Sequence, residues 1–106
     1  MMVGLRATRM YSDDTIVKAT DDNVAGDLAD GHVVILNLKN GIYYGLNPVS
    51  ARIWQMIQEP IAVRDIRNQL MAQYEVEVDR CNRELDTLLE TLASHGLIEA
   101  TPAVAT

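Results

Sequence analysis

The side chains best suited to chemistry in this sequence are two histidines and one cysteine, and they form no motif. His32 and His95 lie far apart, and His95 stands beside Gly96, where a histidine more often bonds the last carbonyls of a helix than a metal. Neither Cys-x-x-Cys nor His-Glu-x-x-His occurs. The sequence therefore predicts no metal site and no cofactor.

Cysteine usage indicates packing rather than catalysis. Cys81 is the only cysteine and falls on the apolar positions of a predicted helix, so we expect it to be buried and slow to react. A lone cysteine cannot form an internal disulfide, which is typical of a reducing compartment. The dipole of the same helix favours acids near its start, and this accounts for the cluster of Glu75, Glu77, Asp79 and Glu84. We accordingly expect no enzymatic activity.

The chain has the size and composition of a single domain. Its 106 residues are 48% hydrophobic, which suffices for one core. No apolar run reaches the roughly 20 residues of a membrane span, and the N-terminus lacks the layout of a signal peptide, so we expect a cytoplasmic protein without a membrane partner. The net charge of −6 disfavours nucleic acid as a partner and is compatible with a protein or peptide.

The first half of the chain predicts a three-stranded antiparallel meander. Residues 32–38 and 42–46 are rich in β-branched and aromatic side chains, and Asn40-Gly41 between them is typical of a two-residue type I′ turn. Residues 24–28, which precede these two strands, give a weaker strand signal and complete the meander. The turn sets the hairpin register, which pairs Leu38 with Tyr43, Leu36 with Gly45, Asn37 with Tyr44 and Ile35 with Leu46.

The second half of the chain changes to helical spacing and predicts three helices. Asn47 suits the N-cap of the first helix and Pro48 its first turn, where the missing N–H of proline costs nothing. Residues 63–74 form the second helix, with apolar side chains at four-residue steps. A three-stranded antiparallel sheet followed by three helices describes a winged-helix-like α+β domain.

The third predicted helix covers residues 79–94. Asp79 is placed to cap its start and Gly96 to end it. Its apolar stripe comprises Cys81, Leu85, Leu88 and Leu92. Leu97 and Ile98 then return to pack on the core.

The predicted hairpin carries more apolar surface than three helices can cover. Both of its faces are largely apolar, whereas a small antiparallel sheet normally has one polar face. The N-terminal segment, or a second copy of the chain in a homodimer, would cover the extra face. Alternatively, the outer strand accepts an added strand from a peptide, because it lacks the lysine, proline or bulge that usually protects an edge. Its residues are Ile42, Tyr43, Tyr44, Gly45 and Leu46.

Two stretches of the sequence resemble the PqqD-like family. The first stretch is Gly41-Ile-Tyr-Tyr-Gly-Leu-Asn47, followed by Ser50-Ala51-Arg52-Ile53-Trp54. The second is the spacing of Leu85, Leu88-Leu89, Leu92 and Gly96-Leu97-Ile98. The resemblance covers about residues 24–99, nearly the whole chain.

This resemblance implies a recognition element that docks the leader segment of a ribosomally made precursor peptide. The element presents the leader to a separate modifying enzyme, such as a radical-SAM protein, a cyclase or a leader peptidase. The stand-alone length is most similar to the free-standing partners of lasso-peptide systems, and a quinone-cofactor pathway is the alternative. The chain would then act as a peptide chaperone.

The same resemblance implies where the leader binds. The leader is added as a strand along residues 42–46 and is wedged against the third helix. By position, the helix side of the cleft comprises Cys81, Glu84, Leu85 and Leu88, and the cations that would meet acids in the leader are Arg80 and Arg83.

Two other classes of function compete with peptide binding. A DNA-binding winged helix would need basic residues at the hairpin tip and on the third helix, where only Lys39, Arg80 and Arg83 occur among several acids. A small enzyme or metal carrier is disfavoured by the missing motifs described above.

The expected domain covers residues 15–99. A flexible segment at residues 1–14 and a disordered tail at residues 100–106 flank it. Residues 15–19 are a candidate for a short additional strand. Residues 11–23 are acidic and poorly patterned, and here the sequence departs from the family pattern.

Overall fold

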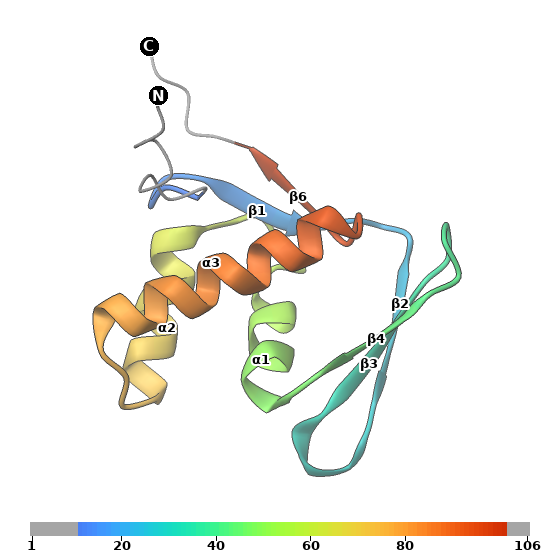
Figure 1. The fold of residues 1–106 in the computed structure, drawn as a ribbon, viewed down its shortest axis with the longest axis horizontal. Helices are drawn as coiled ribbons and strands as arrows, with labels where there is room; N and C mark the ends of the chain where they lie inside the picture. Colours follow the sequence, from blue (N-terminus) through green and yellow to red (C-terminus); the bar gives the residue numbers. More distant parts are fainter. Residues whose placement is uncertain (1–10, 102–106) are drawn as a thin grey trace, which may run out of the picture.

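The computed structural model describes residues 11–101, which form two small antiparallel sheets and three α-helices (Figure 1). One sheet has the order β2-β3-β4 and the other the order β5-β1-β6. The α+β class with three helices is therefore confirmed, although the second sheet was not expected. In chain order the elements are β1 (Ile16–Ala19), β2 (Asn23–Asp27), β3 (Val33–Asn37), β4 (Tyr43–Leu46), α1 (Pro48–Met56), β5 (Ile61–Ala62), α2 (Val63–Gln73), α3 (Val78–Ser94) and β6 (Ile98–Thr101).

The β2-β3-β4 sheet is the predicted meander, but its hairpin register differs by two residues from the predicted one. Val33 pairs with Leu46, Val34 with Gly45, Ile35 with Tyr44 and Leu36 with Tyr43. The predicted pairs Leu38–Tyr43, Leu36–Gly45, Asn37–Tyr44 and Ile35–Leu46 are wrong. Because the shift is an even number of residues, every side chain keeps its predicted face of the sheet.

The side chain of Asn37 explains the shifted register. Its Oδ1 accepts hydrogen bonds from the N–H of Lys39 at 3.1 Å and of Asn40 at 3.0 Å, which turns the chain immediately after β3. The loop is therefore longer than the predicted two-residue type I′ turn, and within it Gly41 takes a positive φ of 70° while Asn40 does not. Local side-chain bonding thus overrode the Asn-Gly turn signal.

The second sheet joins three distant parts of the chain. Ile16 of β1 lies opposite both Ala62 of β5 and Thr101 of β6. The candidate strand at residues 15–19 is confirmed, but it belongs to this sheet and not to the meander. Strand β6 includes Ala100 and Thr101, which had been assigned to the tail. The remainder of the tail, residues 102–106, and residues 1–10 lie outside the described residues.

The acidic segment before β1 holds the start of α2. No side chain caps α2; instead the carbonyls of Asp13 and Thr15 accept its first N–H groups, from Arg64 at 3.0 Å and Val63 at 2.9 Å. The carboxylate of Asp13 also binds Arg67 through both oxygens, at 2.6 and 3.2 Å. Residues 11–14, which were expected to belong to a flexible segment, make hydrogen bonds to α2 and α3.

The helices begin and end close to their predicted limits. Asn47 caps α1, because its Oδ1 accepts the N–H of Ser50 at 2.8 Å, and Pro48 occupies the first turn as predicted. Helix α2 ends one residue before the predicted limit. The predicted cap of α3 is wrong: Glu77 is the N-cap residue, without a side-chain bond, and Asp79 lies inside the first turn. Gly96 ends α3 with a positive φ of 77°.

The buried stripe of α3 differs from the predicted one at a single position. It consists of Cys81, Leu85, Leu89 and Leu92, whereas Leu88 is only half-buried. Leu88 and Leu89 lie on opposite sides of the line through Cys81, Leu85 and Leu92, and the hydroxyl of the buried Tyr11 donates to the Leu89 backbone carbonyl at 3.3 Å. The sequence pattern admits either leucine, and in the structure Leu89 is the fully buried one.

We expect the two adjacent leucines of α3 to differ in their contribution to stability. Leu89→Ala should lower the free energy of unfolding by about 2–5 kcal/mol, because Leu89 has no exposed surface and its removal leaves a cavity. Leu88→Ala should cost roughly 1 kcal/mol, because Leu88 is partly exposed already. Urea denaturation of both variants tests this, and a larger loss for Leu88→Ala would refute the assignment of the stripe.

Candidate functional site

The outer edge of β4 carries backbone groups that no strand of the described chain pairs. β4 is the last strand of its sheet. The N–H of Asn37 donates to the carbonyl of Ile42 at 3.1 Å. From that bond, the alternation of an antiparallel ladder turns the N–H and C=O of Tyr43 and Gly45 away from β3. The edge therefore offers a short row of hydrogen-bond donors and acceptors.

Where β4 passes into α1, a hollow of about 410 Å³ lies between the first turn of α1, the end of α2 and the first half of α3. Its walls are mostly apolar, from Val49, Ile53, Leu70, Tyr74, Val76, Cys81, Leu85 and Leu88. Polar groups stand among them, from Asn47, Ser50, Glu75, Arg80 and Glu84. An apolar hollow of this size holds one or two large side chains of a ligand.

A more open hollow continues along the same flank of α3. It is lined by Arg83, Glu84, Thr87, Leu88 and Thr91, and it shares Glu84 and Leu88 with the first hollow. We call the two hollows and the free edge of β4 the groove. Of the two edges of the sheet, only that of β4 leads directly into residues that line a hollow, because Asn47 follows it in the chain.

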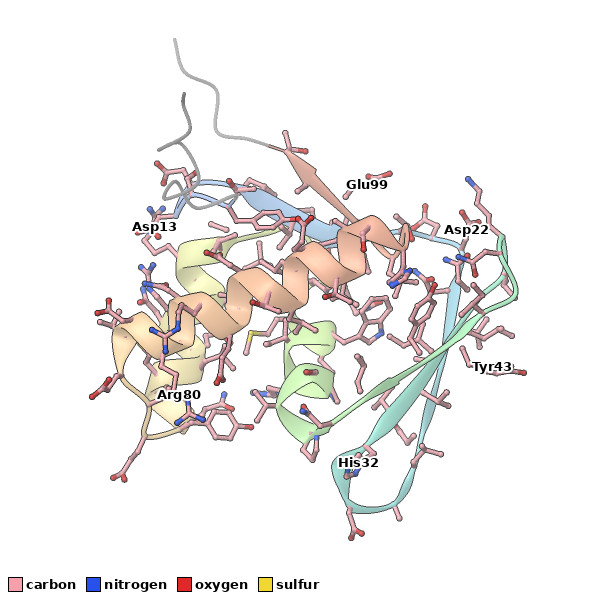
Figure 2. The ribbon with its side chains drawn as sticks, in the orientation of Figure 1. Asp13, Asp22, His32, Tyr43, Arg80 and Glu99 are labelled. Atoms are coloured by element: carbon pink, nitrogen blue, oxygen red, sulfur yellow. The ribbon has the colours of Figure 1, made fainter. Side chains whose placement is uncertain are left out.

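The structure brings together all the helix residues that were predicted to bind a peptide. Arg80, Cys81, Glu84, Leu85 and Leu88 line the first hollow, and Arg83 lines the second. Arg80 lies near the N-terminal end of α3, at the opposite side of the molecule from Tyr43 (Figure 2).

The predicted strand residues lie outside both hollows. Ile42, Tyr43 and Gly45 are exposed, and Tyr43 points away from α3 (Figure 2). Leu46 is buried in the core. Tyr44 is half-buried, with its ring centroid 4.9 Å from that of His95. A strand added beside β4 would therefore meet backbone on one side and place alternate side chains toward α3 or beside Tyr43.

Sequence reasoning missed the part of the groove formed by α1 and α2. Ile53 and Leu70 are buried in the core and also lie at the wall of the hollow. Val49 and Tyr74 gave a signal that was overlooked. The sequence places both of these large apolar side chains at the ends of predicted helices. In the structure they are 41% and 38% exposed.

The charges of the groove are largely balanced. Arg80 Nε lies 2.9 Å from Glu84 Oε2, one helical turn along α3, and both side chains are 64% exposed. Such a pair adds little to stability. It leaves neither ion as a bare charge in the hollow, so the apolar wall is the main feature that a ligand would meet.

Cys81 is buried, as the sequence predicted, although it lies at the wall of the hollow. Burial raises the pKa of its thiol; Arg67 opposes this rise and Glu84 adds to it. The thiol is therefore protonated at neutral pH and is a poor nucleophile. Its position fits a packing surface for a ligand.

The described residues contain neither a cluster typical of a metal site nor a helix suited to a membrane. Within residues 11–101, no three His, Cys, Asp or Glu side chains come together in a group that could hold a metal ion. In the same range, no helix has the length and apolar character needed to cross a membrane.

Comparison with known proteins gives a family and two similar structures. Residues 32–98 match the family described as Coenzyme PQQ synthesis protein D (PqqD). A solved structure of TbiB1 in complex with the TbiA(beta) leader peptide is 32% identical, with a TM-score of 0.71, over 84% of this chain and 99% of that one. No curated protein sequence matches the chain.

The second similar structure is that of a lasso peptide synthetase B1 complexed with the leader peptide. It is 26% identical, with a TM-score of 0.67, over 81% of this chain and 98% of that one. The resemblance noted from residues 41–54 and 85–98 is thereby confirmed, and the chain belongs to the PqqD family.

Proposed function

We propose that this chain binds the leader segment of a ribosomally made precursor peptide and delivers it to a separate modifying enzyme or leader peptidase. The leader is added as a strand along β4, and its anchor side chains enter the groove beside α3. The observation that carries this proposal is the free β4 edge, which runs directly into an apolar hollow. The leader complexes of the two similar structures support it.

Strand addition accounts for affinity without a particular charge on the leader. The outward N–H and C=O groups of Tyr43 and Gly45 bond the leader backbone whatever its sequence. Each such bond contributes about 0.5–1.5 kcal/mol net. The short edge alone is therefore too weak, since ordering a flexible peptide costs several kcal/mol.

The apolar hollow supplies the remaining affinity and the selectivity. Leu85 and Leu88 form its α3 side, and Val49 and Ile53 its α1 side. A large apolar side chain of the leader is removed from water there, and a well-buried anchor contributes about 2 kcal/mol or more. We therefore infer that a few apolar residues of the leader are recognised, with a weak dependence of affinity on salt.

Delivery to an enzyme follows from the form of the complex. A leader held by its backbone and a few anchors leaves the rest of the precursor free, so an enzyme can act on that part while the leader stays bound. Lasso-peptide processing is the pathway that the similar structures favour. Processing should then require this chain and the leader in the same reaction.

We expect Gly45→Pro to weaken leader binding by about tenfold, which corresponds to about 1.4 kcal/mol. Proline removes the N–H that faces outward, and it removes no bond to β3. The measurement is fluorescence anisotropy with a labelled leader probe. We define the probes as the synthetic leader of a short precursor encoded beside this chain's gene and, in parallel, the TbiA(beta) leader peptide.

Gly45→Ala is the matched control for that experiment. It keeps the N–H, and a Cβ at this position meets no atom within 4 Å, so binding should stay close to that of the wild type. Circular dichroism establishes that both variants are folded. Normal binding by a folded Gly45→Pro variant would mean that the leader is not an added strand on β4.

We also expect Leu88→Ala to weaken binding of the leader probes at least about tenfold, because Leu88 lines both hollows. Leu28→Ala is the control, since it makes the same chemical change at a side chain that is 55% exposed and lines neither hollow. Both are measured by anisotropy at low and at moderate salt. Wild-type affinity in Leu88→Ala, together with loss of all binding in moderate salt, would show that charge and not the apolar hollow reads the leader.

A further inference from the structure

Strand β4 and helix α3, the two sides between which the leader would lie, contact each other at the hairpin end of the sheet. There the ring of Tyr44 in β4 lies against the ring of His95, the C-cap of α3, with the rings tilted by 46°. Asn40 in the hairpin loop reaches the carbonyl of His95 at 3.5 Å. From this end β4 and α3 diverge toward α1 (Figure 1). These contacts link the hairpin end of the sheet to the C-terminal end of α3.

Apolar packing holds the inner face of the β2-β3-β4 sheet, where Val33, Ile35 and Leu46 are buried in the core. The outer strand β2 is not held in this way. Every residue of β2 except Asn23 is exposed, including Val24 at 53%. Tyr44 is only half-buried, and His95 is exposed. Directional contacts at the hairpin end can therefore add to the core packing in fixing the position of the sheet relative to α3.

Asn37 begins such a set of contacts. Its side chain is only 3% exposed, and both of its polar ends are bonded. The oxygen accepts the loop N–H groups already described, and Nδ2 donates to Asn23 Oδ1 at 2.8 Å. Burial of an amide is tolerated only when its groups are bonded, so Asn37 strongly favours this one arrangement.

The contacts continue from Asn23 to the end of α3. Asn23 Nδ2 lies 2.9 Å from Thr20 Oγ1 and 3.0 Å from the Thr20 carbonyl. The hydroxyl of Thr20 lies 3.0 Å from the carbonyl of Gly96 and 3.2 Å from that of Leu97. We call Asn37, Asn23 and Thr20 the polar chain. It connects the hairpin that carries β4 to the residues that end α3.

We propose that the polar chain sets the width of the groove, so that Asn37, Asn23 and Thr20 are positioning residues for the leader. This inference rests on the proposed function. Hydrogen bonds define one distance and one angle, whereas the exposed contacts around them do not. A loosened polar chain lets β4 move relative to α3, and the leader can no longer bond the edge and fill the hollow at once.

Two variants test this by removing the side-chain hydrogen bonds of Asn23 or of Thr20. Asn23→Ala removes its middle member. Thr20→Val removes the hydroxyl and keeps the side-chain shape, whereas Thr20→Ser keeps the hydroxyl and is the conservative control. Because Asn23 and Thr20 act in one chain, the double variant should be no worse than the more severe single one.

Two readouts separate positioning from mere stability. Nitroxides on Glu90→Cys in α3 and Val24→Cys in β2, which line neither hollow, report the distance between helix and sheet. The labelled protein also carries Cys81→Ala to remove the native thiol, and because Cys81 lines the first hollow, affinity is measured in the unlabelled variants that keep it. We expect Asn23→Ala and Thr20→Val to broaden this distance distribution, and Thr20→Ser to leave it as in the parent. Affinity for the leader probes should fall by roughly five- to tenfold, chiefly through faster dissociation.

An unchanged distance distribution in Asn23→Ala and Thr20→Val would overturn the proposal, and so would a broadened one with normal affinity. If the unaltered protein binds no leader probe, the proposed function fails. The distance measurement then still decides, on its own, whether the polar chain positions the sheet.

Discussion

The groove depends on a strand whose backbone is bonded on one side only. The ladder to β3 uses the polar groups of Tyr44 and Leu46 and leaves those of Tyr43 and Gly45 facing outward. An exposed edge of this kind is normally blunted by a charge, a proline or a bulge. Here it runs into an apolar hollow instead, and the two features together fit a partner that is extended and carries apolar side chains.

The surrounding elements can be understood as supports for that edge and for the helix opposite. Asp13 and Thr15 bond the first turn of α2, and α2 forms one side of the hollow. The hydroxyl of the buried Tyr11 donates to the backbone carbonyl of Leu89, and Leu89 itself is fully buried. Leu88, on the other flank of α3, is half-buried and lines both hollows. The acidic N-terminal segment thus contributes to the site from a distance.

The sequence predicted the parts of the fold that local patterns determine. The three helices, the N-cap at Asn47, the meander and the helix side of the groove all follow from periodicity, capping and the family resemblance. The predicted hairpin register was wrong because the side chain of Asn37 accepts hydrogen bonds from the loop N–H groups. The composition of a turn does not reveal such a bond. The second sheet was not predicted because β1, β5 and β6 are short strands from three distant parts of the chain. The α1 and α2 walls were missed because residues such as Ile53 serve the core and the site at once.

Hydrogen exchange of individual backbone amides tests the central claim most directly. The N–H groups of Tyr43 and Gly45 should exchange quickly in the free protein, because they face away from β3. With a bound leader probe, both should become strongly protected, while the Tyr44 amide, already bonded to β3, should change little. A probe that binds and leaves Tyr43 and Gly45 unprotected would contradict strand addition on β4.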